Sequence, residues 1–125
     1  MSRTPHHPTR EQIELPMVLD CLSDPIRLAI VYQLAQQERV SSELCCGDFT
    51  GLAGKSNLAY HFAKLRECGL MLTRVAGTNR FVRLRREDLD ARFPGLLDAV
   101  ISSAAKDADR LQLLGEFEET AAGGS

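Results

Sequence analysis

The sequence has no apolar run that approaches the roughly 18 residues a membrane-spanning helix needs. Its first ten residues, MSRTPHHPTR, are polar and lack the apolar stretch of a secretory signal. Four cysteines in 125 residues are too few for a disulfide scaffold. We therefore expect a cytoplasmic protein whose cysteines are kept as thiols by a reducing compartment, with no membrane partner.

The parts of a catalytic site are also missing. The chain has no glycine-rich motif of the kind that cradles phosphate groups. A nucleophile pair can be drawn between Cys45 or Cys46 and His61, but neither an orienting third residue nor an oxyanion loop accompanies it. The sequence therefore predicts a protein that is not an enzyme.

The length and composition suit a single globular domain. The chain is 44% hydrophobic and 26% charged, and 125 residues can bury a core without staples. Residues 1–12 contain prolines and histidines without periodicity and are interpreted as a disordered arm. Residues 13–118 form the expected domain, and residues 119–125 a flexible tail.

Positive charge is concentrated in one segment, although the net charge of the chain is −2. Between Gly54 and Arg86, eight basic residues and one acidic residue give a charge of +7, which leaves −9 for the rest. The basic residues are Lys55, Lys64, Arg66, Arg74, Arg80, Arg83, Arg85 and Arg86. Such a concentration indicates a polyanionic partner, with a solvated charged face as the alternative.

Two helices are predicted in the first third of the chain. Asp24 is a good helix cap and Pro25 suits the first helical position, so a helix begins there and runs to about Gln37. A shorter helix covers 15–22 and precedes it. A third short helix, capped by Ser41 or Ser42, is expected to contain the adjacent cysteines at 45 and 46.

The next predicted helix has two different faces. Leu58, Phe62 and Leu65 form one buried stripe, and Gly69 is well placed as the C-terminal cap. The opposite face carries hydrogen-bonding and cationic groups of the lengths that reach base edges and phosphates. These are Lys55, Ser56, Asn57, Tyr60, His61 and Lys64.

A hairpin and a long terminal helix complete the pattern. The run MLTRVAGTNRFVRLR mixes β-branched and aromatic residues around a turn at 77–79. A helix then begins near Pro94, with an apolar seam at Leu97, Val100, Ile101, Ala104, Ala108, Leu111 and Leu114. Such a seam favours pairing with a partner helix, and packing on its own domain is the alternative.

Short helix, polar turn, helix with a cationic face and basic hairpin make a mainly α winged helix-turn-helix with a small β-hairpin. The sequence resembles the arsenic-responsive (ArsR/SmtB) family of bacterial transcriptional regulators through LSDPIRLAIVYQL, KSNLAYHFAKLRECGL and RVAGTNRFVRLRREDL. These stretches cover most of residues 17–90. The resemblance implies a homodimer that pairs through its terminal helices, binds a partly palindromic double-stranded operator and represses until an inducer releases it.

By the same resemblance, the helix from Lys55 to Cys68 would enter the major groove. The residues carried over as DNA contacts are Lys55, Ser56, Asn57, Tyr60, His61 and Lys64, together with Arg74 and Arg80 in the wing. Ala59 and Tyr60 replace the serine and histidine common in the family, which implies a different operator. For His61, a local hydrogen bond on the helix surface is the alternative role.

The inducer is left open by the residues. The zinc-type site of the family needs histidine on the last helix, and histidine occurs here only at 6, 7 and 61. The arsenic-type pattern, Glu-Leu-Cys-x-Cys-Asp, becomes ELCCGD here, with Gly47 at the second thiolate position. A soft metal or metalloid ion at Cys45 and Cys46 would need a third thiol and local unwinding of the helix. No metal is assigned on this pattern.

Thiol chemistry is the interpretation we favour slightly over metal binding. A cysteine near a helix N-terminus has a lowered pKa, which would make Cys45 or Cys46 reactive. Cys21 or Cys68 would be the resolving thiol, or both would only pack in the core. A winged helix without any cysteine-based sensing is the third possibility.

Overall fold

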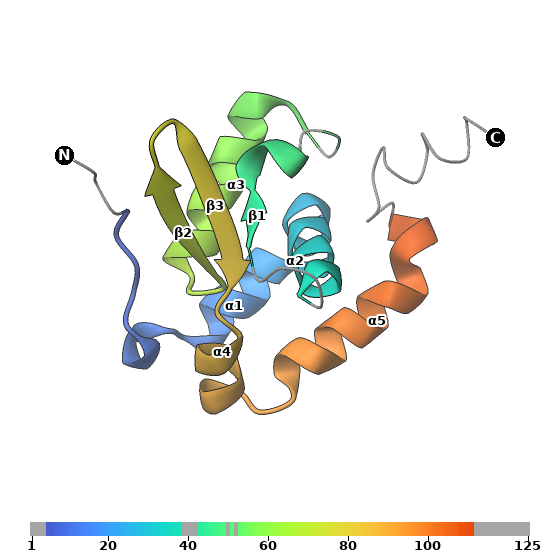
Figure 1. Ribbon diagram of the computed structural model, residues 1–125. Coiled ribbons are helices and arrows are strands. Elements are labelled where there is room, and N and C mark those ends of the chain that lie inside the picture. Colours follow the sequence, from blue (N-terminus) through green and yellow to red (C-terminus); the bar gives the residue numbers. More distant parts are fainter. Residues whose placement is uncertain (1–4, 39–42, 50, 52, 112–125) are drawn as a thin grey trace.

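The computed structural model describes residues 5–38, 43–49, 51 and 53–111, apart from the side chains of residues 55 and 108–111. The elements in chain order are η1 (Arg10–Gln12), α1 (Leu15–Leu22), α2 (Pro25–Gln37), β1 (Leu44–Cys45), η2 (Cys46–Phe49), α3 (Lys55–Glu67), β2 (Met71–Ala76), β3 (Asn79–Leu84), α4 (Arg86–Arg92) and α5 (Leu96–Leu111). Figure 1 shows the small sheet standing beside α3, with α5 running along the other side of α2. None of the described helices is long and apolar enough to cross a bilayer.

The predicted helix boundaries of α2 and α3 are confirmed. Asp24 caps α2, because its Oδ1 accepts hydrogen bonds from the backbone N–H groups of Ile26 and Arg27 at 2.8 and 3.1 Å. After α3, Gly69 adopts a φ of +91°, which ends the helix in a left-handed turn. A Cβ at Gly69 would lie 2.5 Å from Cγ1 of Ile13, so glycine is required there by space as well as by conformation.

The wing, defined as the hairpin of β2 and β3, is confirmed and gains a third strand. The strand order is β1-β3-β2, and β1 pairs antiparallel with β3 through Leu44 opposite Val82 and Cys45 opposite Phe81. A two-residue strand with one pairing partner is invisible to local periodicity. The sequence therefore indicated a two-stranded hairpin where the chain builds a three-stranded antiparallel sheet.

The predicted third helix is wrong over its described residues. Positions 44–45 are a strand and positions 46–49 a single 3-10 turn, whereas Ser41 and Ser42 lie outside the described residues. The Asp48 side chain accepts a 3.1 Å hydrogen bond from the backbone N–H of Cys45. This local bond and the pairing with β3 satisfy backbone groups that a helix would otherwise use.

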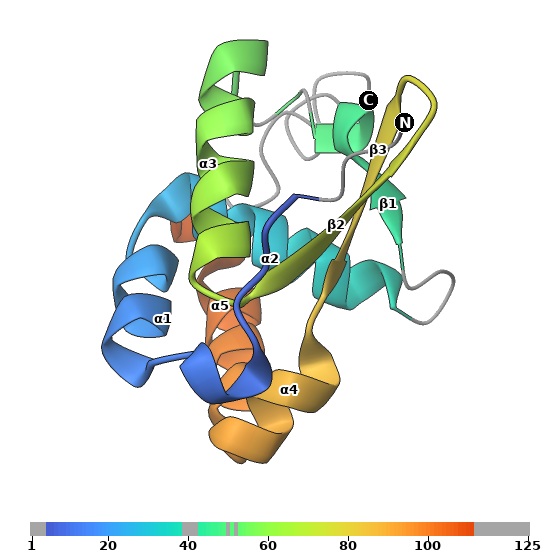
Figure 2. The same ribbon diagram turned by 90° about the vertical axis from the view of Figure 1, so that its left-hand side faces the viewer.

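Residues 5–12 lie against the wing and α4, where the sequence suggested a disordered arm. The backbone N–H of Thr73 donates to Nε2 of His7 at 2.9 Å, and Arg85 donates to the carbonyl oxygen of Pro8 at 2.7 Å. Figure 2 shows this segment passing beside β2 before η1. The arm supplies acceptors to an edge strand and to a buried guanidinium, which gives it a defined position.

The apolar seam of α5 packs partly on its own domain. Leu97 is buried in the main core, and Ala104 is buried against Ala29 and Tyr32 of α2. Val100 and Ile101 are half-buried. The remaining seam positions, at 108, 111 and 114, lie outside the described side chains. The described part of the seam therefore contacts α2 of the same chain.

Phe49 fixes η2 against α3. Its side chain has no exposed surface, and its ring meets that of Phe62 edge-on, with ring centres 5.5 Å apart and planes at 76°. Phe62 belongs to the buried stripe of α3, together with Leu58 and Leu65. The short η2 thus packs against α3 where the sequence predicts a longer helix.

Candidate nucleic-acid interface

The outward face of α3 carries polar side chains at helical spacing. Ser56, Asn57, Tyr60 and Lys64 are all exposed, and we call this set the reading face. Tyr60 is an exposed large aromatic, with 54% of its surface accessible. The ammonium of Lys64 lies 5.5 Å from the centre of the Tyr60 ring, which orients both side chains. The reading face thus combines donors, a cation and an aromatic on a rigid element.

The two arginines expected to act from the wing differ in their surroundings. Arg74 donates two hydrogen bonds to the Glu43 carboxylate, at 3.1 and 2.8 Å, and lies over the Phe81 ring. The hydrogen bond from Arg74 lowers the pKa of Glu43, so the pair stays charged near neutral pH. Arg80 is exposed and makes no ion pair with a carboxylate of the described residues. Of the two arginines, Arg80 therefore has the charge that is more available to an external anion.

Part of the basic segment is neutralised inside the protein. Arg85 is buried and pairs with Asp88 at 2.8 Å, while Arg86 pairs with Glu38 and Asp98, each at 2.9 Å. These two guanidiniums join the end of the wing to α2, α4 and α5. Their charges serve packing, so the field that a polyanion meets is smaller than the sequence count of +7 suggests.

His61 is buried, which corrects its expected place on the surface of the helix. Only 6% of its surface is exposed. The Arg27 guanidinium donates to Nδ1 at 3.2 Å, and Oδ1 of Asp24 lies 4.0 Å from the same nitrogen. Burial lowers the pKa of His61 against the opposing effect of Asp24, so the ring is neutral at pH 7. His61 connects α3 to the start of α2.

We expect this histidine to make folding stability fall below about pH 6.5. The unfolded chain takes up a proton near that pH, whereas the folded protein binds it only at lower pH, so acid favours the unfolded state. The pKa of His7 is also lowered, first by burial and then by Arg66 and Arg85, so His7 adds to the loss of folding stability at low pH. Each group contributes at most about 1.4 kcal/mol per pH unit. Urea unfolding at pH 7.5 and pH 5.5 should show a smaller pH effect for His61→Gln than for wild type, and an unchanged effect would contradict this assignment.

Cys46 does not have the low thiol pKa expected from a helix N-terminus. Cys46 is half-buried in η2, and burial raises the pKa of its thiol to about 11. Cys45 is the last residue of β1, and Cys46 is the first residue of η2. Among the described residues, no group of three or more Cys, His, Asp or Glu side chains could hold a metal ion.

Cys46 also borders a pocket of about 300 Å³ between η2, α3 and the wing. Its other walls include Leu58, Phe62, Thr73 and Arg80. The remaining two cysteines, Cys21 on α1 and Cys68 after α3, are buried and free of disulfide bonds.

A winged helix-turn-helix that exposes such a face on α3 and a cation on its wing belongs to the DNA-binding class. Residues 24–71 match the family model described as "Bacterial regulatory protein, arsR family". The chain is 34% identical to the HTH-type transcriptional regulator YceK of Bacillus subtilis over 85 residues, covering 66% of this chain and 82% of that protein. It is 32% identical over 112 residues to the arsenic resistance transcriptional regulator ArsR1 of Pseudomonas putida, covering 86% and 84%. The protein belongs to the arsR family.

The protein is thus a DNA-binding transcriptional regulator, as its fold and its relatives agree. Both relatives are regulators rather than enzymes. The match of residues 24–71 runs from the cap of α2 through α3 to the first residue of β2, so it includes the reading face and both members of the cysteine pair at 45 and 46.

Proposed function

We propose that the protein is an operator-binding repressor that docks α3 in the major groove of double-stranded DNA. The exposure of the reading face carries this proposal. Asn57, Ser56 and Tyr60 are the base-contacting candidates, while Lys64 and Arg80 neutralise phosphates. Lys55, at the first position of α3, keeps its proposed phosphate role from the sequence alone.

Two expected contacts take other roles in this proposal. His61 is buried and acts by positioning α3 on α2, without touching DNA. Arg74 is paired with Glu43, so its main role is to hold the wing beside β1 rather than to contact phosphates. The direct electrostatic contribution of each protomer therefore falls mainly on Lys55, Lys64 and Arg80.

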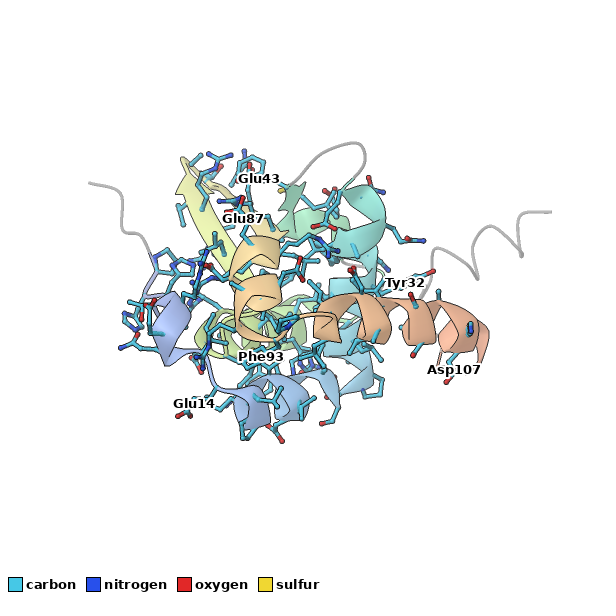
Figure 3. All side chains as sticks on the ribbon, turned by 90° about the horizontal axis from the view of Figure 1, so that it is seen from below. Glu14, Tyr32, Glu43, Glu87, Phe93 and Asp107 are labelled. Carbon is cyan, nitrogen blue, oxygen red and sulfur yellow. The ribbon has the colours of Figure 1, made fainter. Side chains whose placement is uncertain are left out.

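The regulator acts as a homodimer in this proposal, through its terminal helices. Leu15, Met17 and Leu19 are exposed apolar side chains on α1, between 40% and 48% accessible. A groove of about 360 Å³ runs between α1, α2 and α5 and is lined by residues that include Leu19 and Val100. Figure 3 views the molecule from below, with Glu14 just before α1 and Asp107 near the far end of α5. Apolar surface on both terminal helices supports a partner copy there.

Release from the operator is proposed to follow oxidation of cysteine thiols. A soft metal or metalloid ion is the less supported inducer, because no third ligand accompanies Cys45 and Cys46 among the described residues. Thiol oxidation needs two sulfur atoms and no further ligand.

The salt dependence of DNA binding tests the phosphate contacts. With three phosphates neutralised per protomer, by Lys55, Lys64 and Arg80, the dimer should show a log–log slope of about −5, which is roughly a thousandfold loss of affinity between 50 and 200 mM salt. Binding to duplex DNA from upstream of the protein's own gene can be measured by mobility shift. Lys64→Ala should reduce the slope by about 2, and the control Lys106→Ala on exposed α5 should leave it unchanged. A flat salt response would contradict the proposed interface.

A further inference from the structure

Two buried thiols meet where α1 packs against the end of α3. Cys21, near the end of α1, is 4% exposed, and Cys68, directly after α3, is 5% exposed. The two side chains line the same pocket and influence each other's ionisation, although 46 residues separate them in the sequence. Neither takes part in a disulfide in this structure. The fold thus brings two reducing groups from different elements into direct contact.

A pocket gives small molecules a route to this pair. Its volume is about 270 Å³, and both Cys21 and Cys68 line it. Its charged walls are Arg27 and Lys64 together with Asp20 and Glu67. A neutral molecule the size of a hydroperoxide fits this space, and the charge of Arg27 favours a thiolate at Cys68.

The contact makes the two sulfur atoms chemically unequal. The hydrogen bond with Cys21 lowers the pKa of Cys68 against the effect of burial, and a backbone hydrogen bond from Leu70 acts in the same direction. The same contact, together with burial, raises the pKa of Cys21. Cys68 is therefore the nucleophile of the pair, and Cys21 holds the proton.

We propose that Cys21 and Cys68 form a dithiol that a hydroperoxide converts to an intramolecular disulfide. The Cys68 sulfur attacks the O–O bond, forms a sulfenic acid and releases an alcohol, or water when the oxidant is hydrogen peroxide. The Cys21 sulfur then displaces the hydroxyl group of the sulfenic acid as water. In sum, two thiols and one hydroperoxide give one disulfide, one alcohol and one water, and the two electrons lost by sulfur reduce the peroxide.

Oxidation of this pair changes the position of α3, which is the link to regulation and rests on the proposed DNA-binding function. A disulfide needs a sulfur separation of about 2.05 Å, shorter than any hydrogen-bonded contact, so the end of α3 must move toward α1. The hydrogen bond of 3.4 Å from the Cys68 thiol to the carbonyl oxygen of Leu65 is lost at the same time. A tilt of α3 misplaces the reading face, so the oxidised protein binds DNA more weakly.

The adjacent pair at 45 and 46 provides a matched control within the same chain. Those two cysteines are half-buried, Cys45 ends β1 while Cys46 begins η2, and the thiol pKa of Cys46 is raised by burial. They are more exposed than Cys21 and Cys68, so reaction by exposure alone would favour them. If exposure decides the reaction, an oxidant should consume Cys45 and Cys46 first. If the proposed dithiol is correct, it should consume Cys21 and Cys68 first.

Peptide mapping of the full-length protein after treatment with hydrogen peroxide tests the proposal. Trypsin places Cys21 in the fragment of residues 11–27, Cys68 in 67–74, and Cys45 with Cys46 in 40–55. We expect mass spectrometry to find fragments 11–27 and 67–74 joined, with a loss of two hydrogen atoms that dithiothreitol reverses. The paired serine variant Cys45→Ser/Cys46→Ser should give the same joined fragments, and Cys68→Ser should not.

DNA binding of the same samples separates this inference from the proposed function. Peroxide should weaken binding of wild type and of Cys45→Ser/Cys46→Ser at least tenfold, reversibly, and should leave Cys68→Ser unchanged. A disulfide or stable oxidation confined to fragment 40–55 would overturn the inference while reduced protein still binds DNA. Failure of reduced wild type to bind DNA would overturn the proposed function, whereas the joined fragments would still support the dithiol. Because the mapping uses wild type, the test does not depend on the folding of any variant.

Discussion

Replacing Tyr60 by alanine is expected to lower the affinity for operator DNA by roughly ten- to hundredfold, which corresponds to about 1–3 kcal/mol. Tyr60 lies at the centre of the reading face, is 54% exposed and holds Lys64 over its ring. Its removal deletes an aromatic contact and frees the lysine side chain. Because the side chain contributes little to the core, the unfolding free energy should change by less than about 0.5 kcal/mol.

Fluorescence anisotropy with operator and scrambled duplexes at one fixed salt concentration gives the most informative comparison. Tyr60→Ala and Asn57→Ala should lose affinity mainly for the operator, since base contacts specify sequence. Arg80→Ala should lose affinity for both duplexes alike, since phosphate contacts do not depend on the base sequence. If Tyr60→Ala bound like wild type, α3 would not present this face to the groove.

Much of the fold follows from local signals in the sequence. The Asp24-Pro25 pair sets the start of α2, and Gly69 sets the end of α3, because caps act within one helical turn. The spacing of Leu58, Phe62 and Leu65 identifies the buried side of α3. The opposite side is then exposed by elimination, so Ser56, Asn57, Tyr60 and Lys64 were predictable as surface residues.

Long-range contacts explain the predictions that failed. Residues 43–49 are not α-helical because β1 pairs with β3, which is 38 residues further along the chain at the Leu44–Val82 pair. His61 is buried because α2 brings Arg27 against its ring from 34 residues away. Arg86 is neutralised by Glu38 across 48 residues. Periodicity within one helix does not contain any of these partners.

The dithiol at Cys21 and Cys68 likewise depends on a long-range contact that local sequence patterns do not contain. In the sequence, each of these cysteines sits at a position that suits a small core residue, so simple packing is the economical interpretation. The contact between them depends on how α1 docks on α3, and the neighbouring pocket depends on Arg27 of α2 as well. The two adjacent cysteines at 45 and 46 are more conspicuous in the sequence. Their geometry is nevertheless less favourable for forming a disulfide than that of Cys21 and Cys68.

Replacing Phe49 by alanine is expected to have the largest effect on stability, a loss of about 3–5 kcal/mol. The side chain is completely buried and contacts the Phe62 ring edge-on, so truncation removes apolar contacts and leaves a cavity. Such a loss is a large part of the roughly 5–15 kcal/mol that stabilises a typical domain. Urea unfolding followed by circular dichroism measures it directly.

Substitution of Phe49 by leucine, which is larger than alanine, provides the control for this site. Phe49→Leu keeps most of the volume, so its loss should be clearly smaller than that of Phe49→Ala. A change below about 1 kcal/mol in Phe49→Ala would show that η2 does not anchor α3. Because η2 is a single 3-10 turn, Phe49 is the side chain that holds it on the core, and its packing against Phe62 transmits that support to the helix bearing the reading face. Phe49→Leu should therefore retain operator binding under conditions in which Phe49→Ala is partly unfolded.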